Sequence, residues 1–232
     1  MQTTTSAIAA AGKQTCPQTC PLCRDAAAAP LATVMNRWYL HCAHCGLAFM
    51  SPADRLSTEE EQSHYRHHRN TPTDPGYRRF LSKVTVPLIP LLRPRACGLD
   101  YGCGPGPTLS VMLREAGFKV SDYDPCFAPH QSLLSRTYDF ITCTEAAEHF
   151  HEPAEEFGRL DRLLRPGGCL AVMTETYSNP DTFVDWWYVR DPTHVCFYAA
   201  ETMTWIANQR SWRAIPHTQN VTFFIKPALF YD

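Results

Sequence analysis

The sequence predicts an α/β protein: a doubly wound, mostly parallel sheet preceded by a small cysteine-rich module. From position 96 onward, strand-like and helix-like segments alternate around Gly-rich turns, which is the order expected of such a sheet. Ahead of this pattern, cysteines gather in paired spacing. The 232 residues suffice for one full α/β domain and an appendage, but not for two large domains.

Composition places the chain among ordinary globular proteins. Hydrophobic residues make up 44% and charged residues 19%, and no apolar run reaches the roughly 18 residues needed to span a bilayer. Residues 1–15 are Thr- and Ala-rich without a basic or a sustained apolar region, so they predict a disordered arm and not a signal peptide. We expect a cytoplasmic protein without a membrane span. A formal charge of −2 provides no global basic field for nucleic acid.

Four of the eleven cysteines form two CxxC pairs: Cys20, Cys23, Cys42 and Cys45. Their spacing is typical of a four-thiolate structural zinc site, because each CxxC turn presents two sulfurs to a tetrahedral ion. The alternative is buried free thiols, but so small a segment lacks a core, whereas metal ligation supplies on the order of 10 kcal/mol. We predict a zinc ribbon over residues 16–52, with a strand at 34–40. Cys16, His41 and His44 stay outside the ligand set.

Residues 53–93 are predicted to be a linker followed by a helix. The polar run 54–63 resembles a connector, and a His- and Arg-rich stretch follows at 64–70. Between positions 77 and 92, apolar residues recur at helical spacing, while Pro87 and Pro90 limit or kink the later turns. We expect this helix to pack against the main domain.

The main domain is predicted over residues 94–232. Strands are expected at 96–101, 119–123, 138–144 and 169–174, with helices at 107–115 and 153–164. Residues 166–168 form a Pro-Gly-Gly turn before the last of these strands. Residues 212–215 and 221–225 suit a terminal antiparallel pair.

A glycine-rich turn follows the first strand of this domain. Glycines at 102, 104 and 106 would let the backbone approach a ligand closely, and the N-terminus of the next helix favours a negative group such as a carboxylate. Three glycines alone fit nucleotide-like cofactors in general. The flanking acids Asp100 and Asp124 therefore decide between cofactors.

The segment Asp100-Tyr101-Gly102-Cys103-Gly104-Pro105-Gly106 resembles motif I of the class I S-adenosylmethionine-dependent methyltransferases. The resemblance continues at 138–141, 145–149 and 164–168 and covers roughly residues 75–230. It implies a Rossmann-like, doubly wound, mostly parallel sheet with an antiparallel terminal strand, and S-adenosyl-L-methionine as cofactor. It also implies residues that cradle the methionine portion of the cofactor: Asp100, Gly102, Gly104 and Gly106.

Asp124 matches the family's acid that binds the ribose hydroxyls, with Asp122 as the second choice. Without that role, Asp124 would merely begin an Asp-Pro turn. The chain departs from the family between Asp124 and Tyr138, where about a dozen residues stand in place of the usual helix and third strand. The family's adenine-binding acid has no clear counterpart there.

Glu145, Glu148 and His149 follow the strand at 138–144, and in a helical turn they would share one face. This E-x-x-E-H pattern is similar to that of ubiquinone-biosynthesis O-methyltransferases, where such residues bind a divalent cation beside a catechol-like acceptor. One hypothesis is therefore Mg²⁺ or another divalent ion at these three residues. The other is that Glu145 and His149 line the cofactor site or cap the helix without a metal.

Residues 186–198 form an aromatic segment in the region where this fold often carries substrate-binding elements. Trp186, Trp187 and Tyr188 would hold a planar or apolar acceptor. His194 beside them would accept a proton near neutral pH and is the first candidate for general base, ahead of His149. The alternative is a core histidine bonded to a backbone carbonyl, with the tryptophans as packing.

Three functions are compatible with these motifs. The leading one is S-adenosylmethionine-dependent methylation of a small-molecule acceptor at oxygen or carbon, since the Asn/Asp-Pro-Pro-Tyr motif of amino methyltransferases is absent after the strand at 138–144. The runner-up is a methyltransferase for ribosomal or transfer RNA, with the ribbon and the basic residues at 64–69 and 78–79 on phosphates. The third is an inactive scaffold protein that keeps the cofactor fold.

Overall fold

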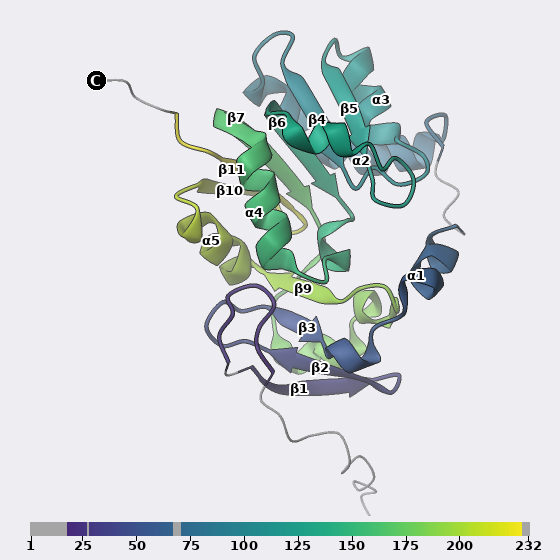
Figure 1. Cartoon of the computed structure of the whole chain (residues 1–232), viewed down its shortest axis with the longest axis vertical. Coiled ribbons are helices and arrows are strands. Elements are labelled where there is room, and N and C mark those ends of the chain that lie inside the picture. Colours follow the sequence, from purple (N-terminus) through teal and green to yellow (C-terminus); the bar gives the residue numbers. More distant parts are fainter. Residues whose placement is uncertain (1–17, 27, 67–70, 229–232) are drawn as a thin grey trace, which may run out of the picture.

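A six-stranded sheet forms the centre of the main domain. The computed structural model describes residues 18–26, 28–66 and 71–228. The strand order is β10-β11-β7-β6-β4-β5, with β5, β4, β6 and β7 parallel and β11 and β10 antiparallel (Figure 1). The strands are β4 Cys97–Tyr101, β5 Lys119–Tyr123, β6 Tyr138–Thr144, β7 Leu164–Met173, β10 Arg213–Thr218 and β11 Val221–Ile225. The predicted Rossmann-like sheet with an antiparallel end is confirmed.

Helices cover both faces of this sheet. Successive strand residues point to opposite faces, so Phe140 packs with α2 (Pro75–Leu88) and α3 (Thr108–Glu115), whereas Ile141 packs with α4 (Pro153–Leu163) and α5 (Ala200–Gln209). The α2 helix starts two residues before the predicted one, because the Asp74 carboxylate accepts from the backbone N–H groups of Gly76 and Tyr77. After Leu88 it tightens into a 3₁₀ turn, η2, Ile89–Leu91.

Two parts of the sheet differ from expectation. Strand β7 begins at Leu164 and not at 169, since Leu164 pairs with Tyr138 and Cys169 pairs with Phe140. The predicted Pro-Gly-Gly turn is therefore a bulge within one strand. Between Asp124 and Tyr138 the chain forms a 3₁₀ turn, η3 (Gln131–Ser135), and no strand, so β5 is an edge of the sheet.

A second sheet joins the N-terminal module to the main domain. Its order is β1-β2-β3-β9-β8, from β1 Ala29–Val34, β2 Arg37–His41, β3 Ala48–Met50, β8 Thr176–Tyr177 and β9 Cys196–Ala199. In Figure 1 β9 lies between β3 and the main domain. The predicted single strand at 34–40 is wrong, because Met35 and Asn36 have φ of 50° and 63° and turn β1 into β2 as a tight hairpin.

A short helix, α1 (Thr58–Tyr65), stands where a connector was predicted. Ser57 and Glu60 form a capping box, in which each side chain accepts from the other's backbone N–H. The helix has no buried residue. Its attachment to the rest of the molecule therefore rests on the polar contacts described below. Within the described ranges, no helix is both long and apolar enough to cross a membrane.

Candidate active site

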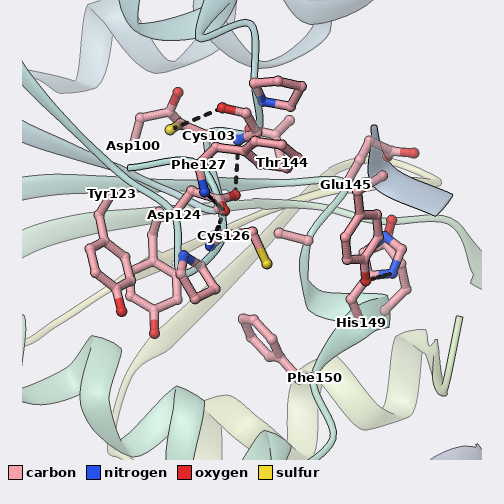
Figure 2. A pocket seen from close by; sticks show the side chains of 18 of the residues that line it. Asp100, Cys103, Tyr123, Asp124, Cys126, Phe127, Thr144, Glu145, His149 and Phe150 are labelled. Carbon is pink, nitrogen blue, oxygen red and sulfur yellow. Dashed lines mark hydrogen bonds between the residues drawn. The ribbon is translucent and has the colours of Figure 1, made fainter. Parts of the chain in front are cut away.

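A cavity of about 710 Å³ opens at the carboxyl ends of the parallel strands β4, β5 and β6. This is the edge at which open α/β sheets bind ligands. All six residues predicted to contact cofactor and both predicted catalytic histidines line it: Asp100, Gly102, Gly104, Gly106, Asp124, Glu145, His149 and His194. Figure 2 shows Asp100, Cys103 and Asp124 in one part of it and Glu145 and His149 in another.

The glycine turn leaves open space beside its backbone. Gly102 and Gly104 have φ of 79° and 63°, a region that side-chain-bearing residues rarely adopt. A Cβ at Gly102 would lie 2.6 Å from the Cβ of Ala146, so the turn must pass close to this neighbour. A Cβ at Gly104 would meet no atom within 4 Å. The turn thus offers a ligand direct access to the main chain.

Two acids lie next to this turn. Asp100 is 3% exposed and accepts from Thr142 Oγ1 at 2.7 Å, and burial raises its pKa to about 7. Asp124 accepts from the N–H groups of Cys126, at 2.8 Å, and Gly104, at 3.0 Å, so its carboxylate links two loops. Asp122 instead pairs with Arg114 and does not line the cavity. Asp124 therefore stays the better candidate for ribose hydroxyls.

At the opposite side of the cavity, two imidazoles and a carboxylate converge. One ligating atom each of Glu148, His149 and His194 lies within 4.8 Å of the others. Glu148 is fully buried, and neither carboxylate oxygen has a hydrogen-bond partner among the described residues. Buried charge without a partner is costly. A proton, a cation or a ligand donor is thus needed at this point.

The hydrogen bonds of the two histidines fix their tautomers. His149 Nδ1 lies 3.0 Å from the carbonyl oxygen of Thr193, and His194 Nδ1 lies 2.9 Å from that of Tyr188. A carbonyl only accepts, so both Nδ1 atoms carry a proton, and in the neutral imidazole form Nε2 is the nitrogen that keeps a lone pair. His194 is thus bonded to a backbone carbonyl, as the alternative interpretation expected, and it also lines the cavity. Burial lowers its pKa.

Glu145 does not complete this cluster. The group that could hold a metal contains His194 where the E-x-x-E-H hypothesis placed Glu145. Glu145 begins the turn after β6 with φ of 48°, and its burial, together with the charge of Glu148, raises its pKa to about 9. The segment after Glu145 is a 3₁₀ turn, η4 (Ala147–His149), so the helical face assumed for the three residues does not form. His194 belongs to a different segment, 45 positions after His149 in the sequence.

Helix α1 supplies cavity residues that the sequence did not indicate. Tyr65 Oη lies 3.2 Å from His149 Nδ1, and Glu61 accepts from His151 Nε2 at 2.7 Å. His64 lies 3.5 Å from the Asp191 carboxylate. The capping signal at Ser57 and Glu60 could have revealed the helix, but nothing in the sequence specified where it packs. Of the basic stretch at 64–70, positions 67–70 lie outside the described residues.

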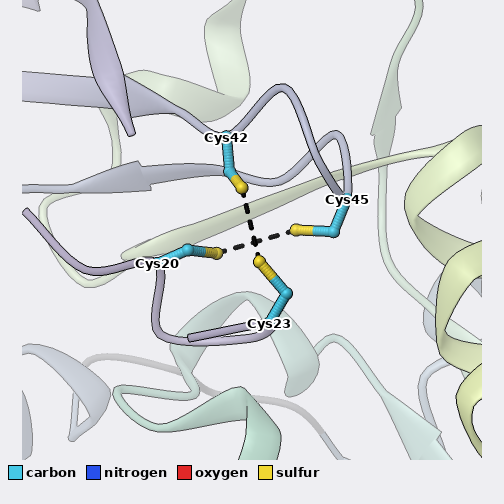
Figure 3. Close-up of side chains that lie close together, drawn as sticks. All are labelled: Cys20, Cys23, Cys42 and Cys45. Atoms are coloured by element: carbon cyan, nitrogen blue, oxygen red, sulfur yellow. Dashed lines mark hydrogen bonds between the residues drawn. The ribbon is translucent and has the colours of Figure 1, made fainter. Parts of the chain in front are cut away.

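The four CxxC cysteines lie together and are not part of the cavity lining. Their sulfurs point toward one another in Figure 3, with 3.6 Å between Cys20 and Cys45 and 3.4 Å between Cys23 and Cys42. Four sulfurs bound at about 2.3 Å to one tetrahedral ion would stand slightly farther apart. The donor set and its geometry therefore fit Zn²⁺. His44 faces Trp205 instead, and Cys16 lies outside the described residues.

Comparison with known proteins places these features in a family. A family model described as "Methyltransferase domain" matches residues 65–216. The ubiquinone biosynthesis O-methyltransferase of Sodalis glossinidius is 26% identical over 58% of this chain and 47% of its own. The malonyl-[acyl-carrier protein] O-methyltransferase of Salmonella typhimurium is 29% identical over 61% of this chain and 64% of its own. The chain thus spans less than two thirds of either relative.

Among solved structures, the chain is similar to the magnesium protoporphyrin IX methyltransferase of Synechocystis with bound SAH. The TM-score is 0.49 at 15% sequence identity, over 73% of this chain and 94% of that one.

Proposed function

Because this chain belongs to the methyltransferase-domain family, we propose that it transfers a methyl group from S-adenosylmethionine to an oxygen or carbon atom of a small molecule. One observation carries the proposal. The glycine turn with its two acids and the cluster of Glu148, His149 and His194 line the same cavity. The groups proposed to bind the cofactor and to accept a proton therefore share one cavity, which is what methyl transfer to an oriented acceptor requires.

The residues around the glycine turn fit the cofactor. The open space beside Gly104 admits a ligand against the backbone, and the N-terminus of α3 begins directly after the turn at Thr108. Asp124 can accept ribose hydroxyls with its remaining lone pairs. S-adenosylmethionine would supply an electrophilic methyl group on a positively charged sulfur. The acids of the cavity suit that positive charge.

His194 is the proposed general base, with His149 beside it. Its Nδ1–H is held by the Tyr188 carbonyl, which leaves the Nε2 lone pair for a proton from the acceptor. The Asp191 carboxylate, 3.9 Å from Nε2, would stabilise the imidazolium as it forms. Trp187 and Tyr188 line the cavity next to this histidine and would contact the rings or apolar parts of the acceptor.

The charge of the cavity favours a small molecule over RNA. Among the described residues that line it are nine carboxylates and one guanidinium, that of Arg159. Arg159 is already paired with Glu156 and the Tyr101 hydroxyl. A phosphate backbone needs cationic partners, and none is free at this site in the described part of the chain.

Binding of the reaction product tests the proposal directly. We expect saturating S-adenosylhomocysteine to raise the melting temperature, because a ligand that binds only the native state adds about 2.7 kcal/mol at one hundred times its Kd. Asp124→Ala should remove most of this shift. Asp122→Ala is the matched control, because Asp122 lies two residues earlier, in β5, and outside the cavity lining; this variant should keep the thermal shift. No shift in the unaltered protein would instead favour the inactive scaffold.

Two metal sites bear on this proposal. The four cysteines would hold a structural Zn²⁺. As the alternative to a general base, a divalent ion in the cavity would use Glu148, His149 and His194 in place of the set with Glu145, because the Nε2 lone pair of His194 can bind an ion or accept a proton but not both. Two imidazoles and one carboxylate suit Mn²⁺ or Co²⁺ better than Mg²⁺, which prefers oxygen ligands.

Calorimetric titration of zinc-loaded protein should therefore show binding of Co²⁺ and Mn²⁺ about tenfold tighter than that of Mg²⁺. Glu148→Gln should remove this binding and Glu145→Gln should leave it. The reverse result would restore the E-x-x-E-H set. No heat from any of the three ions would mean that Glu148 is balanced by a proton or by the acceptor, and that the cavity holds no metal.

A further inference from the structure

The cysteine module contacts the acceptor side of the cavity without lining it. None of the described residues between 18 and 50 is among the lining residues. Its strands nevertheless bond directly to two segments that line the cavity, the 3₁₀ turn η6 (Trp187–Arg190) and the residues before β9 that include His194, and they reach a third, the turn η4 with Glu148 and His149, through Val195. These three segments make up what we call the acceptor wall.

The first connection runs through strand pairing. Ala48 and Phe49 of β3 pair with Phe197 and Cys196 of β9. Directly beyond this pair, Met50 N–H donates to the Val195 carbonyl at 2.8 Å, and Val195 N–H donates to the Glu148 carbonyl at 2.8 Å. A continuous row of backbone hydrogen bonds thus links β3 to Glu148 and passes beside His194.

The second connection runs through two side chains of β2. Arg37 Nη2 donates to the carbonyl of Arg190 at 2.9 Å, and Tyr39 Oη donates to that of Val189 at 3.3 Å. The Tyr39 ring also packs edge-on against Phe197, with centroids 5.7 Å apart. These contacts hold η6, whose Tyr188 carbonyl fixes the tautomer of His194.

The third connection reaches the second CxxC turn, Cys42 to Cys45, which we call the knuckle. Tyr177 of β8 donates its hydroxyl hydrogen to the carbonyl of Gly46, the residue after Cys45. Gly46 N–H in turn donates to the Cys42 carbonyl at 2.8 Å, which closes the knuckle. Ligation of Cys42 and Cys45 would fix the knuckle that joins β2 to β3. The two strands also bury Tyr39, Leu40 and Phe49 in the core that they share with the main domain.

The glycine turn has no such connection. Its backbone bonds run to β5 and Asp124: Gly102 N–H donates to the Tyr123 carbonyl at 2.8 Å, and Gly104 N–H donates to the Asp124 carboxylate. In the described part of the chain, the hydrogen bonds and ion pairs of the cysteine module to the main domain all end on α4 and its N-cap, the acceptor wall or the second sheet. The glycine turn therefore takes no hydrogen bond from the module, and the two are linked only indirectly, through α4, whose Glu156 bonds to the Tyr101 hydroxyl.

We infer that the four-cysteine site is a positioning element for the acceptor wall: metal ligation fixes β2 and β3, and these strands set the placement of Glu148, Tyr188 and His194. This inference rests on the proposed function, in which the acceptor wall holds the acceptor. The cofactor half of the cavity keeps its shape without it. Ligand affinity on the two sides should therefore respond differently to loss of the metal.

Hydrogen exchange on zinc-loaded and chelator-treated protein tests this. Release of the metal should speed amide exchange in residues 187–198 by about tenfold or more, because local opening no longer costs the bonds to β2 and β3. Exchange in residues 97–104 should change by less than about twofold, and added Zn²⁺ should restore the starting pattern. Unchanged exchange at 187–198, or equal acceleration in both segments, would overturn the inference.

A variant that keeps all four cysteines distinguishes loss of the contacts to η6 from unfolding of the module. Arg37→Met with Tyr39→Phe removes the side-chain bonds to η6 and should speed exchange at 187–190 by about tenfold while zinc content stays unchanged. Tyr138→Phe is the matched control, because its hydroxyl also donates to a backbone carbonyl, that of Leu133, far from the wall. If the double variant exchanges like the control, β2 does not position η6.

S-adenosylhomocysteine affinity, measured on the same samples, separates this inference from the proposed function. If the inference is correct, affinity is retained after metal release, within about twofold. Absence of binding in the zinc-loaded protein would contradict the proposed function, while the exchange pattern would still decide whether the module supports the wall.

Discussion

Substitution of His194 by asparagine is expected to lower the rate of methyl transfer by about 10²–10⁴-fold, the range that a positioned general base contributes. Asparagine can keep an N–H near the Tyr188 carbonyl, which His194 Nδ1 contacts at 2.9 Å, but it offers no basic nitrogen at the Nε2 position. The affinity for S-adenosylhomocysteine should stay unchanged. The measurement is product release with a small acceptor that supports turnover by the unaltered protein.

The pH dependence of the methyl-transfer rate provides a separate test of His194 as the general base. Burial lowers the pKa of His194 below its usual 6.5, so the neutral, proton-accepting form dominates at and above neutral pH. Activity should be level there and should fall as pH drops through that lowered pKa. His217→Asn, on β10 and outside the cavity lining, is the control and should match the unaltered protein. Full turnover by His194→Asn would exclude the assigned role.

The second large effect is expected at Gly104. Valine there would point a branched side chain into the space beside the turn, where a Cβ meets no protein atom within 4 Å. Because we assign that space to the cofactor, affinity for S-adenosylhomocysteine should fall by about a hundredfold or more, which corresponds to about 2.7 kcal/mol. Calorimetric titration measures it.

Gly117→Val provides a matched control for this experiment. Gly117 has φ of 93°, and a Cβ there would also meet no atom within 4 Å, yet it lies outside the cavity lining. Both variants should lose a similar free energy of unfolding, about 1–3 kcal/mol, from strain at positive φ. Only Gly104→Val should lose affinity. Equal affinities in the two variants would place the cofactor elsewhere.

The elements of the parallel sheet were predictable because their signals are local. Strands β5 and β6 lie where the sequence placed them, since each is a short segment with β-branched or aromatic residues between turn residues. The tight β1–β2 hairpin was missed, because Met35 and Asn36 carry no Gly signal for a turn with positive φ. The helix α1 was missed as well, because its exposed, polar sequence has no apolar stripe.

Sequence by itself determined the parallel sheet, the glycine turn with Asp100 and Asp124, and the four cysteines, because each depends on spacing within a short segment. Only the tertiary structure decided that His194 and not Glu145 joins Glu148 and His149, and that the cysteine module shares a sheet with β8 and β9. The reason is physical. Strand pairing and side-chain convergence bring together residues far apart in the chain, and local periodicity carries no information about such contacts.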